Sequence, residues 1–259
     1  MKQIEFICTE KYKNLIPEPY PSYKKIPDWY LKTKNLEHSK CPFKKFVNDI
    51  KPVKKLTNIK TCPAVSDAIN TGYIIPSWTN FMFRKIDNQI YFNWENTFEA
   101  DYEYHHRNDE FEGMNDFESP QFNSFNKISS PWAIKTSPGI SCIVTHPFWS
   151  REKRFTTVSG VVHTDVTPIL LKWFFELNMN LENNLEIDEV TKERNCIVRG
   201  EPLILIIPFV RENFESNVSY ISDQEYLSNI RERALYATHD WFGKSIYGNF
   251  RTSIGKLFK

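Results

Sequence analysis

The sequence has little glycine, no paired cysteine motif and no long apolar run. It holds 8 Gly against 15 Pro in 259 residues, which predicts stiff, extended connections rather than flexible linkers. The five cysteines are scattered, and no two form a C-x-x-C pair. This argues against a disulfide framework or a zinc site and favours a reducing, cytoplasmic compartment. No stretch approaches ~18 apolar residues, so we expect neither a signal peptide nor a membrane span.

An excess of charge of one sign is also lacking. Lys and Arg total 33 against 32 Asp and Glu, which gives a net charge of +1. The chain as a whole therefore has no electrostatic attraction to nucleic acid or to a membrane surface. This balance argues against a dedicated DNA-binding protein, although it leaves room for a local basic patch. Aromatic residues are dense by contrast, at 15% of the chain, and 41% of all residues are hydrophobic. A chain of this length can bury one large core or two modest ones.

Residues 1–60 are predicted to form an extended arm that packs on the body. Four prolines lie within residues 11–32, and proline holds itself and its predecessor in extended conformations. The aromatic residues interleaved with them are Tyr20, Tyr23, Trp29 and Tyr30. Ordered aromatic packing is the plain interpretation of this segment, and peptide binding is the alternative.

Residues 61–215 are predicted to form a β-rich core domain. Pro63 and Gly72 bracket one or two helical turns near its start. Hydrophobic residues that alternate on either side of Asp87-Asn88 indicate a β-hairpin with a two-residue turn. The polar residues 99–127 are interpreted as a surface excursion, or lid, within this domain.

Further strands are predicted in the second half of the core domain. We expect a second hairpin across Ser137-Pro138-Gly139 and a third strand pair around Gly200-Glu201-Pro202. Residues 168–178 fit either a strand or a helix. The predicted class is therefore α+β and β-rich, with antiparallel hairpins that form a central sheet or a barrel-like core.

Residues 216–259 change character and are predicted to be a C-terminal helix with a basic tail. Ser222 and Glu225 have the spacing of a capping box, which marks the start of a helix. Helical periodicity then continues to about Trp241. A docked tail is the plain interpretation of the basic, aromatic residues that follow.

The stretch SGVVHTD, residues 159–165, supports a first chemical hypothesis, a non-haem iron site. His163 and Asp165 lie two residues apart in a predicted strand, so their side chains share one face. Sites of two histidines and one carboxylate bind Fe(II) and leave positions open for a cosubstrate. His239 follows at a spacing typical of 2-oxoglutarate oxygenases, with Arg251 for the cosubstrate carboxylate. However, His239 falls in the predicted C-terminal helix, whereas the distal ligand of these enzymes normally follows a core strand.

A second hypothesis comes from the order of short motifs, which resembles that of dUTPase-like β-clip enzymes. The resemblance implies a nucleotide ligand, and the candidate ligand-binding residues are Gly72, Tyr73, Gly160 and Asp165. His163 stands where those enzymes have the carboxylate that activates water, and their Arg-Ser-Ser phosphate motif is absent. Pyrophosphatase chemistry is therefore not implied. In the plain interpretation of this stretch, Asp165 is a turn residue.

The chain also resembles a family of uncharacterised proteins of tailed phages. The similarity covers most of residues 15–212 and is carried, in order, by IPEPYPSYKKIPDWY, CPAVSDAINTGYIIP, PWAIKTSPGISCIVTHP, GVVHTD and VRGEPLILIIPFVRE. In that family Asp usually replaces His163, so a family-wide iron site could not use this histidine. The resemblance implies a phage origin and a shared β-rich body, but no reaction and no catalytic residue.

Three functions from different classes follow from these features. The first is a non-enzymatic binding or regulatory module in the cytoplasm of the infected cell, which holds a protein partner or a second copy through its aromatic surface. The first alternative is a virion component that assembles through its arms. The second alternative is an Fe(II)/2-oxoglutarate oxygenase built on His163, Asp165 and His239. Because no catalytic constellation is complete, an enzyme is not favoured, and no cofactor is expected for the other two functions.

Overall fold

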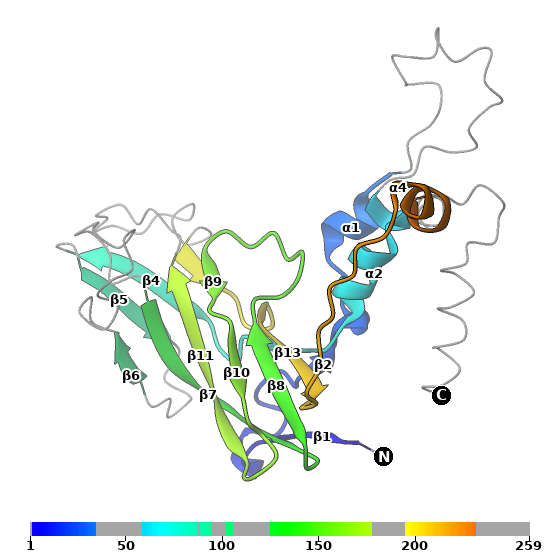
Figure 1. Cartoon of the computed structure of the whole chain (residues 1–259). Coiled ribbons are helices and arrows are strands. Elements are labelled where there is room, and N and C mark those ends of the chain that lie inside the picture. Colours follow the sequence, from blue (N-terminus) through cyan, green and yellow to red (C-terminus); the bar gives the residue numbers. More distant parts are fainter. Residues whose placement is uncertain are drawn as a thin grey trace, which may run out of the picture. The chain divides into compact units, whose positions relative to one another are not determined.

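The structure is a computed structural model that describes residues 2–34, 59–86, 89–94, 102–105, 125–177 and 195–231. The chain divides into two compact units, Met1–Arg211 and Glu212–Lys259. The first unit is β-rich, with three antiparallel sheets and few helices, as predicted from the sequence (Figure 1). No helix of the described residues is long and apolar enough to span a membrane.

The first sheet has five strands and provides the most regular hydrophobic face. Its order is β1-β7-β11-β9, and β6 also pairs with β7. The strands are β1 (Ile4–Ile7), β6 (Tyr102–His105), β7 (Phe125–Thr136), β9 (Phe155–Thr157) and β11 (Ile169–Leu177). Every second residue of β11 from Leu171 to Leu177 is buried, so one face of this strand covers the core.

The second sheet also has five strands, in the order β10-β8-β13-β3-β2, and a smaller third sheet has the order β12-β4-β5. The second sheet contains β2 (Tyr20–Pro21), β3 (Tyr73–Pro76), β8 (Ile140–Thr145), β10 (Gly160–Val162) and β13 (Pro202–Val210). The third contains β4 (Phe81–Ile86), β5 (Gln89–Trp94) and β12 (Cys196–Ile197). The long hydrophobic strand β13 lies in the middle of its sheet, between β8 and β3.

Side chains from all three sheets meet in one hydrophobic core. At its centre Trp173 stacks on Phe175 with ring centroids 3.7 Å apart, and Phe155 meets Trp173 edge-on at 5.1 Å. Phe81 of the third sheet packs against Trp173 at 5.4 Å. The high aromatic content of the sequence is thus partly explained by core packing.

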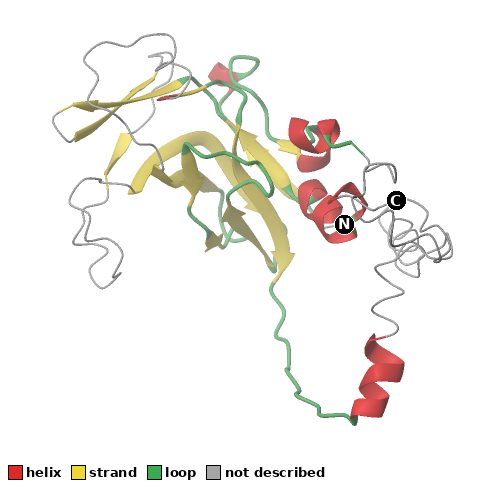
Figure 2. Cartoon of the chain, turned by 90° about the horizontal axis from the view of Figure 1, so that it is seen from above, coloured by secondary structure: helices red, strands yellow, loops and turns green. Residues whose placement is uncertain are grey.

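The helices of the first unit are short and lie outside the strand layers (Figure 2). They are η1 (Glu10–Tyr12), η2 (Ser22–Lys24), α1 (Asp28–Lys32), η5 (Ile59–Thr61) and α2 (Pro63–Asn70). The predicted helical turns at residues 62–73 are confirmed, because α2 begins at Pro63 and Gly72 follows its end with φ +78°. A Cβ atom on Gly72 would lie 2.4 Å from the carbonyl oxygen of Ile206, so only glycine fits there.

The hairpin predicted around residues 87 and 88 is confirmed by the pairing of β4 with β5, which reaches Ile86 and Gln89. The hairpin predicted across Ser137-Pro138-Gly139 is wrong, since β7 and β8 belong to different sheets. The pair predicted around residues 200–202 is also wrong, because β12 pairs with β4 whereas β13 pairs with β3 and β8. In both places the turn carries the chain across the core, from one sheet to another.

Two predicted peripheral segments contribute strands to the body. Residues 2–34 of the predicted arm contain β1, which pairs with β7, and β2, which pairs with β3. In the predicted excursion, residues 102–105 form β6, residues 125–127 begin β7, and residues 106–124 lie outside the described residues. The predicted arm and the predicted excursion therefore both supply strands to the sheets.

The described part of the second unit is an exposed segment followed by a helix. Residues 212–222 have no helix or strand, and Phe214 and Tyr220 are 88% and 95% exposed. The predicted helix start is confirmed, because the Ser222 hydroxyl accepts the Glu225 N–H at 3.3 Å. The helix comprises α4 (Asp223–Glu225) and the π-helical η8 (Tyr226–Arg231). Its predicted continuation to Trp241 lies outside the described residues.

Candidate functional site

Two polar clusters lie at opposite ends of strand β8. Before its start, the turn at residues 137–139 meets the stretch 163–165 and Arg211 at the end of β13. We call this group the corner cluster. After the end of β8, residues 146–154 form a connection to β9 that we call the aromatic loop.

Asp165 fixes the turn of the corner cluster. Its Oδ2 atom accepts the Gly139 N–H at 2.9 Å and forms an ion pair with Arg211. The Arg211 N–H donates in turn to the Gly139 carbonyl at 3.0 Å. The Gly139 hydrogen bond, aided by Arg211, holds the pKa of Asp165 below its usual range, although desolvation opposes this. This geometry agrees with the plain interpretation of Asp165 as a turn residue.

His163 is bound to the same guanidinium. Its Nδ1 atom lies 2.9 Å from Arg211 Nη1 and 2.8 Å from the Ser141 hydroxyl. Because a guanidinium only donates, Nδ1 is the acceptor in this contact. Thr164, between the two residues, points inward, and its hydroxyl lies 2.7 Å from that of Thr136. The prediction that these residues lie in a strand is wrong, since β10 ends at Val162, and it is Arg211 that holds His163 and Asp165 together.

Arg211 occupies the place that the iron hypothesis gives to a metal. It donates to His163 and pairs with Asp165, so a cation bound between these side chains would have to displace the guanidinium. No group of three metal-ligating side chains occurs among the described residues. His239 and Arg251 lie outside them, so the iron hypothesis stays a prediction.

The other residues of the nucleotide hypothesis lie apart from this cluster. Gly160 begins the edge strand β10 and pairs with Val144. The contacts of Gly72 and Tyr73 are with Ser22, Ile206 and Phe6. Tyr73 lines a cavity of about 370 Å³, whose other lining residues are Lys2, Gln3, Ile4, Ile140, Pro208, Phe209 and Val210. None of these contacts involves Asp165, although the cavity beside Tyr73 reaches Ile140 and Val210, the chain neighbours of Gly139 and Arg211.

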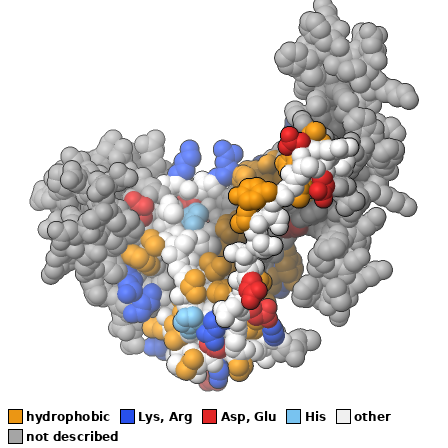
Figure 3. Space-filling view, in the orientation of Figure 1, with side chains coloured by type: hydrophobic (Ala, Val, Ile, Leu, Met, Phe, Trp, Pro, Cys, Tyr) orange, Lys and Arg blue, Asp and Glu red, His pale blue; other side chains and the backbone are white. Residues whose placement is uncertain are grey.

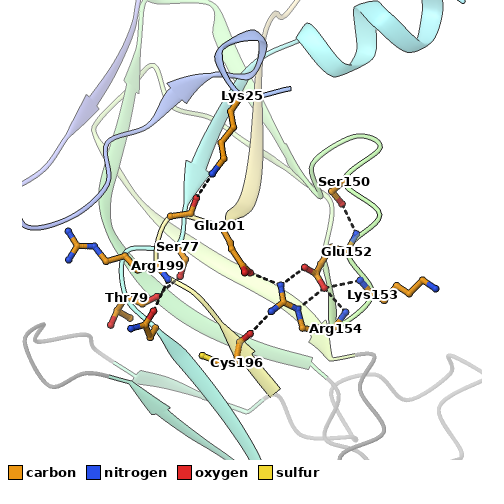
Figure 4. A network of polar contacts seen from close by, with 12 residues as sticks. Lys25, Ser77, Thr79, Ser150, Glu152, Lys153, Arg154, Cys196, Arg199 and Glu201 are labelled. Atoms are coloured by element: carbon orange, nitrogen blue, oxygen red, sulfur yellow. Dashed lines mark hydrogen bonds and ion pairs between the residues drawn. The ribbon is translucent and has the colours of Figure 1, made fainter. Parts of the chain in front are cut away.

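A partly buried ion-pair network anchors the aromatic loop (Figure 4). Arg154 donates to both carboxylate oxygens of Glu152, at 2.9 and 2.6 Å, and also pairs with Glu201 at 2.5 Å. A fourth bond from its guanidinium reaches the carbonyl of Cys196. The Glu152 carboxylate also accepts the N–H groups of Lys153 and Arg154, at 2.8 and 2.7 Å. Burial acts to raise the pKa of Glu152, but the bonds from Arg154 outweigh it and lower this pKa.

His146 forms the second anchor of the loop. Its Nδ1 atom accepts the Thr157 N–H at 3.2 Å, and its Nε2 lies 2.8 Å from the Ser150 hydroxyl. Burial lowers the pKa of His146, and Glu152 only partly opposes this. Since Nδ1 is an acceptor, Nε2 carries the proton and donates to Ser150. This tautomer cannot take a proton from the serine, so the pair is not arranged as a nucleophile and its base.

Between these anchors the loop has an unusual backbone and exposes two aromatic rings. Trp149 and Arg151 are in the left-handed region, with φ of 58° and 59°. Phe148 and Trp149 are 40% and 46% exposed. The indole N–H of Trp29 donates to the Trp149 carbonyl at 2.7 Å, which attaches the N-terminal segment to the loop. The loop thus presents aromatic side chains from a backbone that is fixed at several points.

Several residues of these clusters have no counterpart in the sequence predictions. The pairs of Arg211 with Asp165 and of Arg154 with Glu201 were missed because the partners are 46 and 47 residues apart in the chain. The stretch HPFWSREKR, residues 146–154, carries a usable signal for an exposed loop. In it, two adjacent aromatic residues precede four charges and directly follow a hydrophobic strand.

Comparison with protein-family models, with curated proteins and with solved structures finds no match to this chain.

Proposed function

We propose that this protein is a non-enzymatic binding module that acts in the infected cell, and that the aromatic loop is its contact surface. One observation carries this proposal: a strained, firmly anchored loop exposes Phe148 and Trp149. Large aromatic side chains that lie exposed on a rigid support are typical of protein recognition surfaces.

The backbone of the loop supports a functional role. A residue other than glycine in the left-handed region costs about 1–3 kcal/mol, and such strain persists only where the surroundings fix it. Here Trp149 and Arg151 both adopt it, and the network of Glu152 and Arg154 stabilises the strained form. Folding thus prepares the loop for contact, which reduces the entropy lost on binding.

The polar chemistry of both clusters supports binding rather than catalysis. Arg211 binds His163 and Asp165, whereas Arg154 binds Glu152 and Glu201. The tautomer of His146 is fixed by the backbone of Thr157. The charged and nucleophilic groups named here are therefore engaged in holding turns and loops in place.

Site-specific photo-cross-linking tests this proposal. Benzoylphenylalanine replaces Phe148 in one variant and Tyr23, which is 59% exposed, in a matched control. After irradiation in the host cell, we expect a discrete adduct from position 148 and none from position 23. Identical adduct patterns from the two positions, or no adduct at all, would contradict a contact role for the loop.

Assembly through an extended arm is a second candidate function, and the described start of the second unit favours it. Residues 211–228 are all exposed, and among them Phe214, Val218 and Tyr220 are 88%, 75% and 95% exposed. Bulky apolar residues in a segment without helix or strand are typical of arms that pack on another chain. Light scattering should then give a closed oligomer, whereas a monomer at high concentration would exclude this function.

A further inference from the structure

Exposed basic side chains lie on the aromatic loop, on the turn at residues 198–201 and on a segment bonded to that turn. Lys25, Arg151, Lys153 and Arg199 are exposed, and none forms an ion pair with a described carboxylate. Lys25 donates to the carbonyl of Gly200, which places it beside the turn that carries Arg199. In Figure 4 the side chains of Lys153 and Arg199 extend away from the network on opposite sides, whereas the Lys25 side chain points to the Gly200 carbonyl. The network of Glu152, Glu201 and Arg154 keeps a net charge of about −1 at neutral pH, which offsets only part of the charge of these four basic side chains.

Aromatic rings form a row within this basic surface. The ring centroids of Trp149 and Trp29 are 6.1 Å apart, and those of Trp29 and Tyr30 are 5.6 Å apart. Phe148 adds a further exposed ring next to Trp149 in the chain. Figure 3 shows basic side chains beside a group of hydrophobic side chains at the upper end of the sheets. The surface therefore combines planar apolar faces with positive charge.

We propose that this surface binds single-stranded nucleic acid, an inference that rests on the proposed function of the aromatic loop. Bases would stack on Phe148 and Trp149, and the backbone phosphates would lie near Arg151, Lys153 and Lys25. Stacking platforms beside a positively charged groove are the usual means of binding single strands without sequence preference. Duplexes bind less well, since their bases are stacked on one another and offer no free face.

An acidic protein is the less fitting partner for this surface. Carboxylate side chains would match the four cations, but they offer no planar groups for the exposed rings of Phe148 and Trp149. A nucleotide chain supplies a phosphate and a ring at every step, which suits the interleaved cations and aromatic residues. Because the net charge of the chain is only +1, the attraction is local, and binding should weaken steeply as salt is raised.

Fluorescence anisotropy with a labelled 20-nucleotide oligothymidylate tests this inference on the full chain. We expect binding at 50 mM salt, weaker binding to a duplex of equal length, and an affinity loss of about tenfold or more in Trp149→Ala. The double variant Arg151→Ala/Lys153→Ala should reduce the slope of log K against log salt by about 1.4, at about 0.7 per phosphate contact.

The matched control is Lys2→Ala/Lys135→Ala. It removes the same charge beside the turn at residues 137–139, at the other end of β8, and should leave the slope unchanged. Absence of binding at 50 mM salt, or an equal effect of the control, would overturn the inference.

The cross-linked adduct from position 148 separates this inference from the proposed function. An adduct that nuclease removes supports nucleic-acid binding. An adduct that nuclease leaves unchanged overturns it while it leaves the binding function standing. If position 148 gives no adduct, both fail.

Discussion

Replacement of Arg154 should destabilise the first unit more than replacement of any other partly exposed residue of the aromatic loop. The side chains of Arg154 and Glu152 are only 22% and 18% exposed, and Arg154 makes bonds to Glu152, Glu201 and the Cys196 carbonyl. Breaking a buried ion pair by removing one partner costs about 3–5 kcal/mol. About a fifth of each side chain is exposed, so solvent screens part of the interaction. For Arg154→Met we therefore expect the free energy of unfolding to fall by about 2–3 kcal/mol.

Chemical and thermal unfolding measure this loss. For a unit of 211 residues, 1 kcal/mol corresponds to about 2–4 °C in Tm, so Arg154→Met should lower Tm by about 4–12 °C. Lys153→Met is the matched control, since this neighbouring cation is exposed and has no ion pair with a described residue, and it should stay within about 0.5 kcal/mol.

A double-mutant cycle decides whether the ion pair is the cause. In a Glu152→Gln background, Arg154→Met should cost at least 1 kcal/mol less than in the wild type, because only one charged carboxylate, Glu201, is then left unpaired instead of two. If Arg154→Met and Lys153→Met are equally stable, or if the cycle shows no coupling, the network does not hold the loop and the reasoning is refuted.

Further predictions concern the turns, the histidines and the ligands. Gly72→Ala should destabilise by more than 2 kcal/mol because its Cβ would meet the Ile206 carbonyl, whereas Gly160→Ala, with no atom within 4 Å, should be nearly neutral; urea unfolding of both checks this. The pKa of His146 is lowered by burial, so the unfolded state binds the extra proton first, and stability should fall as pH drops below about 6.5. That loss should be absent in His146→Gln, and a wild type equally stable at pH 7 and pH 5.5 would contradict the argument. If the protein is an oxygenase, anaerobically purified protein should carry stoichiometric iron that His163→Ala loses. If it binds nucleotides, thermal shift should show about 2.7 kcal/mol of stabilisation at 100 Kd of the right nucleotide, and no shift with any nucleotide would remove that hypothesis.

Local features of the fold could be predicted because local chemistry determines them. Pro63 and Gly72 mark the limits of α2 through their backbone preferences alone. The two-residue connection between β4 and β5 follows from alternating hydrophobic residues on both sides. The choice between strand and helix for β11 was open, because its apolar residues include Leu170, which is 46% exposed, as well as the buried Leu171. Packing against the core decided it.

Strand pairing and the polar clusters could not be predicted in the same way. Turn residues such as Pro138 and Gly139 reverse the chain, but they do not specify whether the next strand joins the same sheet or crosses the core. Glu201 and Asp165 are brought close to Arg154 and Arg211 only by the complete fold. The sequence predicted only a general aromatic surface and not this loop. Phe148 and Trp149 differ from core residues such as Trp173 in their exposure, which only the folded structure shows.

The most direct test of the aromatic loop as a preformed contact surface is to repeat the position-148 cross-link in Arg154→Met, at a temperature where the variant remains folded. We predict that the discrete adduct is lost in this variant and retained in Lys135→Met, which removes a cation far along the sheet. An undiminished adduct in folded Arg154→Met would contradict the claim that the partly buried network shapes the loop for binding.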